Sequence, residues 1–354
     1  MRILFVCSYN SIYNEKANPY VASLIDGLRN IGRYEIKCGL SYFWNDFSSF
    51  DILFFQWPEC IFDWNIGEID IEKISYQLDL VKKAGVKTVI TCHNLYPHNR
   101  LPIVKQLYDL VYSKVDAFHH MGNHSLQLMK SQYPNTFHFI APHHIADRFF
   151  NNTNQSYARN QLNIPLDCIV IASYGAFRSD KEKKLFLDMV DDTKNSNINY
   201  LAPRLTIGKF FNGQYAKTPF SFIKKWFIFL VKKIRTSCYL DEERMKQWLS
   251  ATDIVFIQRT EILNSGNVPL AFAAGKVVVG PCIGNVGVIL RETNNFLFKP
   301  DDRKSVKKAI QNAIEEIKKG NKIGKNNYTY AKRNWTVPTV SKTISYNLEI
   351  IVKQ

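Results

Sequence analysis

The segment from residue 252 to residue 281 constrains the fold more than any other part of this chain of 354 residues. It reads as an apolar strand at 253–257, a polar loop that carries Glu261, a short apolar helix, and a second apolar strand at 277–279. Two short buried strands joined through a helix are typical of parallel strands in an α/β sheet. A loop that follows such a strand lies at the carboxyl end of the sheet, where open α/β sheets bind their ligands.

The loop of this segment ends in Asn264, Ser265, Gly266 and Asn267, where a helix is predicted to begin. A helix start presents unpaired backbone N–H groups and the positive end of the helix dipole, and both suit a phosphate. Small residues also let a ligand come close to the backbone. The alternative is an ordinary turn that is capped by Asn or Ser. The rest of the chain decides between a phosphate site and an ordinary capped turn.

The first half of the chain alternates predicted strands with predicted helices. Apolar strands are expected at 3–7, 51–55, 88–91, 117–120 and 137–141, with amphipathic segments between them. This alternation predicts a doubly wound sheet with helices on both faces. After a polar stretch, the second half opens with another apolar strand and a turn that contains Gly175, Arg178 and Lys181. A chain of this length suits two such domains better than one core.

Composition agrees with a folded protein that keeps its thiols reduced. Apolar residues make up 46% of the chain and aromatic residues 14%, which supports packed interiors. The seven cysteines are scattered and form no CxxC pair, which indicates a cytosolic setting. No apolar stretch reaches the roughly 18 residues that span a bilayer. The short apolar run at the N-terminus is read as a strand and not as a signal peptide.

All eight histidines lie between residues 93 and 144. The sequence has no HExxH motif and few carboxylates near them, so neither a metal site nor a cofactor is predicted. Several of these histidines are expected only to satisfy backbone groups at strand ends. His93 and either His119 or His120 are the candidates for function, because a neutral imidazole can bond a hydroxyl or accept a proton.

This organisation resembles that of nucleotide-sugar glycosyltransferases of the GT-B architecture, and in particular the GT4-like group of the bacterial exopolysaccharide and capsule type. In the donor-sugar half the resemblance rests on Asp253 beside a strand, on Ser265 and Gly266, and on the Ala-x-x-x-Gly pattern from Ala271 to Gly275. Weaker signatures in the first half support it. It implies two Rossmann-like doubly wound domains that face each other across a cleft. The domains expected from it are an acceptor-side domain at 1–150, a linker at 151–166, a nucleotide-sugar domain at 167–335, and a final helix at 336–354 that packs on the first domain.

The resemblance also implies a donor site in the second domain. In such enzymes a Gly-x-x-Arg-x-x-Lys turn supplies cations for the donor diphosphate, and fixed cations stabilise the charge that develops on the leaving group. Many GT4 enzymes carry a second glutamate eight positions after the first, but here that position is Pro269. The predicted donor contacts are Gly175, Arg178, Lys181, Glu261, Asn264, Ser265, Gly266 and Asn267.

The acceptor side is expected in the first domain, where polar and aromatic residues follow the strands. His93 matches a histidine that often meets the donor sugar in related enzymes. Glu59, His93 and Glu261 are the predicted catalytic residues, with Glu59 or His93 as the base of an inverting reaction. A retaining reaction, which relies on the departing phosphate, stays open. Trp57, Asn94 and His119 are the predicted acceptor-side contacts.

Net charge is +15, and it is concentrated in one region. Residues 219–235 interleave aromatic and aliphatic side chains with lysine pairs, which suits an element at an anionic membrane surface. A buried helix with snorkelling lysines is an equal alternative. No helix-turn-helix, zinc-finger or RNP-like pattern is present, so nucleic acid is not a predicted partner.

The sequence therefore predicts a hexosyltransferase that moves a sugar from a UDP- or GDP-sugar donor to a saccharide acceptor. The acceptor is expected to be lipid-linked, and the pathway to be bacterial surface polysaccharide synthesis. The expected location is the cytoplasm, at the inner face of the plasma membrane. Two alternatives remain: a binding or scaffold protein that has lost activity, suggested by the missing second glutamate, and a nucleotide-sugar epimerase on the same fold.

Overall fold

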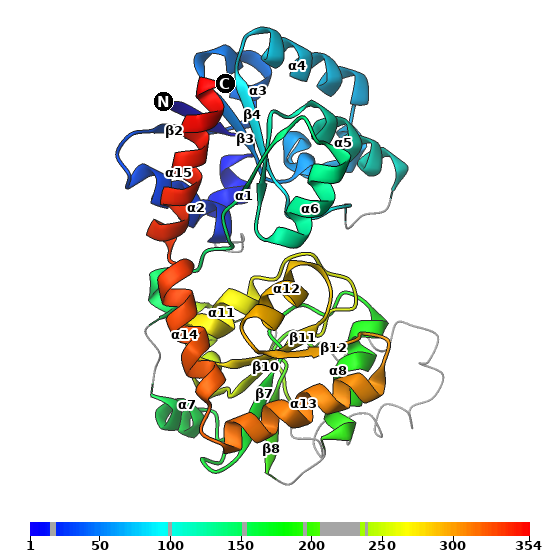
Figure 1. The fold of residues 1–354 in the computed structure, drawn as a ribbon, viewed down its shortest axis with the longest axis vertical. Helices are drawn as coiled ribbons and strands as arrows, with labels where there is room; N and C mark the ends of the chain where they lie inside the picture. The colour runs from blue at the N-terminus through cyan, green and yellow to red at the C-terminus, as the bar shows by residue number, and fades with distance from the viewer. Residues whose placement is uncertain (15–18, 98–100, 151–153, 194–196, 206–233, 238–239) are drawn as a thin grey trace. The chain divides into compact units, whose positions relative to one another are not determined.

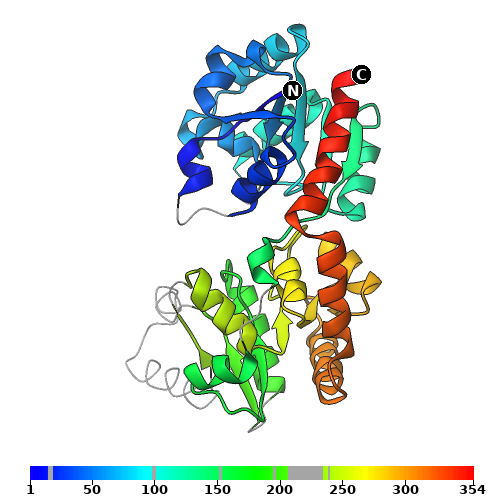
Figure 2. The ribbon, with the colours of Figure 1, turned by 90° about the vertical axis from the view of Figure 1, so that its left-hand side faces the viewer.

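The structure is a computed structural model that describes residues 1–14, 19–97, 101–150, 154–193, 197–205, 234–237 and 240–354. The chain forms two compact units (Figures 1 and 2). The first unit contains Met1–Ala146 and Asn334–Gln354, and the second unit contains Asp147–Arg333. Each unit is built on one six-stranded parallel sheet.

The sheet of the first unit has the order β2-β1-β3-β4-β5-β6. The order reverses between β1 and β3, which makes their carboxyl ends the switch point of this sheet. The strands are β1 (Arg2–Phe5), β2 (Glu35–Cys38), β3 (Ile52–Phe55), β4 (Lys87–Thr91), β5 (Ala117–His120) and β6 (Phe137–Ile140). The α-helices are α1 (Tyr9–Tyr13), α2 (Pro19–Arg29), α3 (Leu40–Asn45), α4 (Ile71–Lys83), α5 (Pro102–Lys114), α6 (Asn123–Gln132) and α15 (Val337–Lys353). Short 3₁₀ helices include Pro58–Phe62 and Ile66–Glu68.

The C-terminal helix α15 is part of the first unit and lies against α2 (Figure 1). Its apolar residues Val340, Ile344, Leu348 and Ile351 belong to the same buried cluster as the inner face of α2. Gly27 lets the two helices approach closely, because a Cβ at that position would lie 2.2 Å from Ser341 Oγ. The last residues of the chain thus help to complete the core formed by the first ones.

The sheet of the second unit has the order β12-β11-β10-β7-β8-β9, so its switch point lies between β7 and β10. The strands are β7 (Ile169–Ala172), β8 (Ile198–Leu201), β9 (Ile234–Arg235), β10 (Ile254–Phe256), β11 (Val277–Pro281) and β12 (Phe296–Phe298). The helices are α7 (Gln155–Gln161), α8 (Asp180–Asp192), α10 (Glu242–Ala251), α11 (Asn267–Ala273), α12 (Gly284–Glu292), α13 (Arg303–Lys318) and α14 (Lys322–Asn334).

Two expectations from the sequence can be compared with the fold. The stretch 151–166, predicted as a linker, contains α7, and Arg159 of this helix is buried in the second unit. The basic and aromatic segment 219–235 lies outside the described residues up to position 233, and its last two residues form β9 beside β8. Within the ranges that the structure describes, no helix combines the length and the apolar character needed to cross a bilayer.

Candidate functional site

The switch point of the second unit brings together the loops that follow β7 and β10. Ser173 Oγ donates a hydrogen bond to Gln258 Oε1 (2.6 Å), and Gln258 Nε2 donates to the carbonyl oxygen of Gly175 (2.7 Å). Ser173 and Gln258 are both fully buried. Since buried polar groups cost free energy unless they are paired, these bonds fix the two loops against each other.

A buried ion pair connects the loop after β10 to the start of α8. Arg259 Nη1 donates to Glu182 Oε2 (2.6 Å) and to the carbonyl oxygen of Ala176 (2.7 Å). Glu182 also accepts the backbone N–H of Arg178 (2.7 Å), while its own N–H bonds the N-cap side chain of Ser179. Arg259 and Glu182 are only 6% and 4% exposed. The loop after β10, the turn after β7 and the start of α8 are therefore held as one rigid body.

Three side-chain nitrogens surround Gly175. A Cβ at this position would lie 2.9 Å from Arg259 Nη2, 3.0 Å from Gln258 Nε2 and 3.2 Å from Asn267 Nδ2. Among the described residues, neither Arg259 Nη2 nor Asn267 Nδ2 has a hydrogen-bond partner. The absence of a side chain at Gly175 therefore lets a guanidinium and an amide that still have donor capacity lie close to the backbone, and these donors are the chemistry an anionic oxygen needs.

Arg178 adds a second guanidinium to the neighbourhood. Partial desolvation and the nearby charge of Arg259 lower the pKa of Arg178, and Glu182 acts in the opposite direction. Glu182 forms an ion pair with Arg259 and also attracts the nearby Arg178. Arg178 lies at the exposed edge of the turn, whereas Arg259 lies inside it.

The predicted donor loop is anchored by the start of α12. The carbonyl oxygen of Leu263 accepts the N–H groups of Asn285 and Val286, and Asn264 Oδ1 accepts from Asn285 Nδ2 (2.8 Å). Gly284 has a φ of 60°, and a Cβ there would lie 2.3 Å from the carbonyl oxygen of Ile262. Glycine is required at this position for both reasons. Glu261, at the other end of the loop, is exposed.

The expectation of unpaired N–H groups at the start of α11 needs a correction. Ser265 Oγ accepts the N–H of Asn267 (3.3 Å), and the carbonyl oxygen of Ser265 accepts the N–H of Val268 (3.2 Å). Pro269, the next residue, has no N–H. The run 264–267 thus contributes the side chain of Asn267 near Gly175, while its first-turn N–H groups are used locally.

Two lysines of α8 differ in their exposure. Lys181 is exposed in the first turn, whereas Lys183 is 8% exposed and pairs with Asp180 (2.7 Å). Arg259, Gln258 and Glu182 were not predicted from the sequence. Two signals were present: an arginine shortly after a buried strand, and a Ser-x-x-Glu capping box at 179–182.

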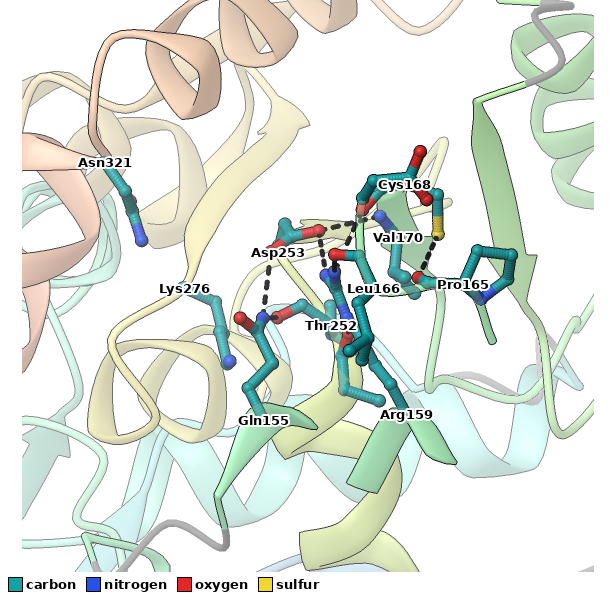
Figure 3. A network of polar contacts seen from close by, with 12 residues as sticks. Gln155, Arg159, Pro165, Leu166, Cys168, Val170, Thr252, Asp253, Lys276 and Asn321 are labelled. Carbon is teal, nitrogen blue, oxygen red and sulfur yellow. Dashed lines mark hydrogen bonds and ion pairs between the residues drawn. The ribbon is translucent and has the colours of Figure 1, made fainter. Parts of the chain in front are cut away.

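Asp253, which the resemblance placed in the donor motif, lies at the amino end of β10, opposite the candidate site. Its carboxylate accepts from Arg159 Nη2 (2.6 Å), the N–H of Val170 (2.8 Å) and Gln155 Nε2 (3.0 Å), as Figure 3 shows. Arg159 also donates to three backbone carbonyl oxygens. Nearby, burial lowers the pKa of Lys276 to about 8, against the opposing effect of Asp253. This network joins structural elements of the second unit.

In the first unit, His93 lies after β4 and contacts residues that follow β3. Its Nε2 lies 3.1 Å from Gln56 Oε1, and its ring stacks on Trp57 with centroids 3.9 Å apart. The ring edge also meets Tyr20. Burial, with smaller contributions from His143, His119 and His144, holds the pKa of His93 well below its usual value. The imidazole is therefore neutral near pH 7.

Two tyrosines of α5 each bond one residue of the predicted acceptor side. Tyr108 donates to Glu59 Oε2 (2.9 Å), and Tyr112 donates to the carbonyl oxygen of Asn94 (2.7 Å). Burial raises the pKa of Glu59, and the hydrogen bonds to its carboxylate oppose this effect. Glu59 is 9% exposed, so it is positioned more rigidly than a surface carboxylate.

The predicted acceptor contact from His119 is disfavoured by its environment. The side chain is fully buried, with Nδ1 3.1 Å from Thr91 Oγ1 and Nε2 2.8 Å from the carbonyl oxygen of Ala141. Both ring nitrogens are therefore occupied by the protein. His119 satisfies backbone and hydroxyl groups, which is the role expected for several histidines of this unit. Among the described residues, no three His, Cys, Asp or Glu side chains group as a metal site.

The buried histidines predict an acid-sensitive first unit. Burial lowers the pKa of His119 and His143 to about 4 and that of His144 to about 3, from 6.5. The unfolded chain therefore takes up protons first, and stability that is complete above pH 6.5 is lost as the pH falls from 6.5 toward these lower values. Each such histidine should lower the free energy of unfolding by up to about 1.4 kcal/mol per pH unit in this window.

Urea unfolding at a series of pH values measures this slope. His144→Gln, which keeps a donor for the carbonyl oxygen of Tyr20, should reduce the slope by about one proton. His124→Gln, outside the buried cluster, is the matched control. A free energy of unfolding that stays constant below pH 6.5 would show that these imidazoles are not buried as neutral groups.

The whole chain is similar in fold to known enzymes. It matches sucrose-phosphate synthase from Thermosynechococcus elongatus with a TM-score of 0.75 and 12% identity, over 100% of this chain and 99% of that one. It matches Anabaena HepE in complex with UDP with a TM-score of 0.72 and 15% identity, over 99% and 100% of the two chains. A glycosyltransferase from Rickettsia africae gives a TM-score of 0.72 at 12% identity, over 100% and 99%.

These similarities and the two parallel sheets confirm the predicted α/β class, with two Rossmann-like domains of the GT-B glycosyltransferase fold. No protein-family model and no curated protein sequence matches the chain. The assignment to the GT4-like group stays a prediction.

Proposed function

We propose that this protein is a glycosyltransferase that binds the diphosphate of a nucleotide-sugar donor at the switch point of its second unit. The observation that carries the proposal is the cluster of donors around Gly175, where Arg259 Nη2 and Asn267 Nδ2 have capacity left for a ligand. Open α/β sheets bind ligands at such a switch point. HepE, which has the same fold, has been solved with UDP and with UDP-glucose.

In this proposal the second unit contributes to the reaction mainly by placing positive charge near the leaving diphosphate. The bond between the anomeric carbon and the β-phosphate oxygen breaks, and negative charge develops on the leaving diphosphate. Arg178 and Arg259 would stabilise that charge, and Asn267 would bond a phosphate oxygen. Glu261 would contact hydroxyl groups of the donor. Gly175, Asn264, Ser265 and Gly266 would shape the site, and Lys181 would contribute long-range charge.

The first unit would supply the acceptor side. The acceptor hydroxyl attacks the anomeric carbon, and its proton goes to a base. His93, neutral near pH 7, and Glu59 are the proposed bases of an inverting reaction. In a retaining reaction the departing phosphate would take the proton. Trp57 and Asn94 would contact the acceptor.

The finer parts of the proposal rest on the sequence. A hexose donor, a lipid-linked acceptor of bacterial surface polysaccharide synthesis, and a place at the cytoplasmic face of a membrane are supported by the resemblance and by the basic residues of 219–235. A protein that binds the nucleotide without transfer is the second candidate, favoured by Pro269 at the position of the usual second glutamate.

Calorimetric titration with UDP and GDP tests the proposal. We expect one nucleotide to bind with a stoichiometry of one per chain, and its sugar conjugate to compete for the same site. Release of the nucleoside diphosphate in the presence of a saccharide acceptor then separates an enzyme from a binding protein. If neither nucleotide nor any common nucleotide sugar binds, the donor site is refuted.

A further inference from the structure

An aromatic column, formed by His93, Trp57 and Trp64, runs from the interior of the first unit to its surface. The Trp57 and His93 rings are stacked with an interplanar angle of 13°, and the Trp64 centroid lies 5.8 Å from that of Trp57. Trp64 is 48% exposed, an unusual exposure for so large an apolar side chain. The column thus connects a proposed base to an indole that solvent reaches.

The aromatic column stands at the switch point of its own sheet. Trp57 follows β3, and Ser8, which follows β1, donates through Oγ to Asp63 Oδ1 (2.6 Å). The loops after the two strands are therefore tied together beside Trp64. This is the place in an open α/β sheet at which ligands are expected to bind.

The backbone holds Trp64 in a conformation that its side chain does not favour. Asp63 and Trp64 have φ values of 48° and 66°, in the left-handed region that a bulky residue rarely adopts. Their N–H groups are fixed by the carbonyl oxygens of Cys60 and Glu59. Such strained residues persist where the surroundings impose them, and they cluster at ligand sites.

The charge around Trp64 indicates the class of ligand. Although the whole chain carries +15, residues 57–72 contain no Lys or Arg. An anionic lipid surface or a phosphate would be repelled here. Among the described residues, Asp63 Oδ2 has no hydrogen-bond partner, so it can accept a bond from a hydroxyl group. The carboxylates of this segment are Glu59, Asp63, Glu68, Asp70 and Glu72.

We propose that Trp64 and Asp63 form a binding platform for a neutral saccharide. The C–H face of a pyranose ring would pack on the indole, whose face carries partial negative charge, and a ring hydroxyl would donate to Asp63. The proposal rests on the proposed function in one respect, because the saccharide bound here would be the acceptor. It adds Trp64 and Asp63, two residues that were not predicted from the sequence.

Fluorine NMR of protein labelled with 5-fluorotryptophan tests the platform directly. The chain contains six tryptophans, and Trp64→Phe assigns the signal of interest. Glucose, galactose, N-acetylglucosamine, cellobiose and lactose are the probes. We expect at least one of them to shift the Trp64 signal saturably. Trp64→Ala should weaken that binding about tenfold, whereas Trp64→Phe, which keeps a ring, should lose less.

The controls separate this proposal from other outcomes. Tyr76→Ala, which removes a more exposed aromatic ring from α4, should leave saccharide affinity unchanged. UDP affinity should be the same in Trp64→Ala and wild type, so a failure of nucleotide binding would affect the proposed function alone. The platform is refuted if no saccharide shifts the Trp64 signal, if Trp64→Ala binds as tightly as wild type, or if only vesicles of phosphatidylglycerol shift it.

Discussion

Arg259→Ala is expected to weaken UDP binding by about tenfold to a hundredfold, since hydrogen bonds to charged groups contribute roughly 1.5–3 kcal/mol. Of the two arginines near Gly175, Arg259 is the buried one. Its Nη2 is the nearest atom to a Cβ built on Gly175. Its position is set by Glu182 and by the carbonyl oxygen of Ala176. A pre-positioned cation loses little conformational freedom when a phosphate arrives, so its removal should be costly.

Three further variants make this result specific. Arg259→Lys should recover part of the affinity, because it keeps the charge and loses the planar fork. Gly175→Ala keeps every charge, yet its Cβ would lie 2.9 Å from Arg259 Nη2, so it should also weaken binding. Arg291→Ala removes an exposed cation from α12 and should have little effect. Undiminished UDP affinity in a folded Arg259→Ala protein would remove this residue from the donor site.

Arg159→Ala is expected to lower the free energy of unfolding of the second unit by about 3–5 kcal/mol, the cost of breaking a buried ion pair on one side only. The Arg159 side chain is 5% exposed and bonds Asp253 together with the carbonyl oxygens of Ala251, Leu166 and Cys168. The substitution would leave the Asp253 carboxylate without its cation, and these carbonyl groups without their donor (Figure 3).

Urea denaturation measures the loss, and two variants control it. Arg159→Met combined with Asp253→Asn removes both charges and should recover part of the stability. Arg148→Ala breaks the exposed pair with Glu242 and should change little. If Arg159→Ala unfolded at the same urea concentration as wild type, the network at the amino ends of β7 and β10 would not hold the second unit together.

Much of the fold could be predicted from the sequence because its signals are local. Short apolar runs between amphipathic segments mark the strands, and this pattern identified β10 and β11 to within a few residues. The Ser-x-x-Glu pattern at the start of α8 is also local.

The pairings within the candidate site were harder to predict because they join distant residues. Arg259 meets Glu182 across 77 positions, and Gln258 meets Ser173 across 85, so no window of sequence contains either pair. Asp253 shows the same difficulty. The resemblance placed it in the donor motif, whereas its carboxylate pairs with Arg159, which lies 94 positions away in the sequence.

The most direct measurement is a crystal structure of the protein with UDP. We expect diphosphate oxygens within hydrogen-bond distance of Arg259 Nη2 and Asn267 Nδ2, packed over Gly175, with the Arg178 guanidinium turned toward the same phosphates. UDP bound elsewhere on the chain, with the Gly175 turn empty, would contradict it.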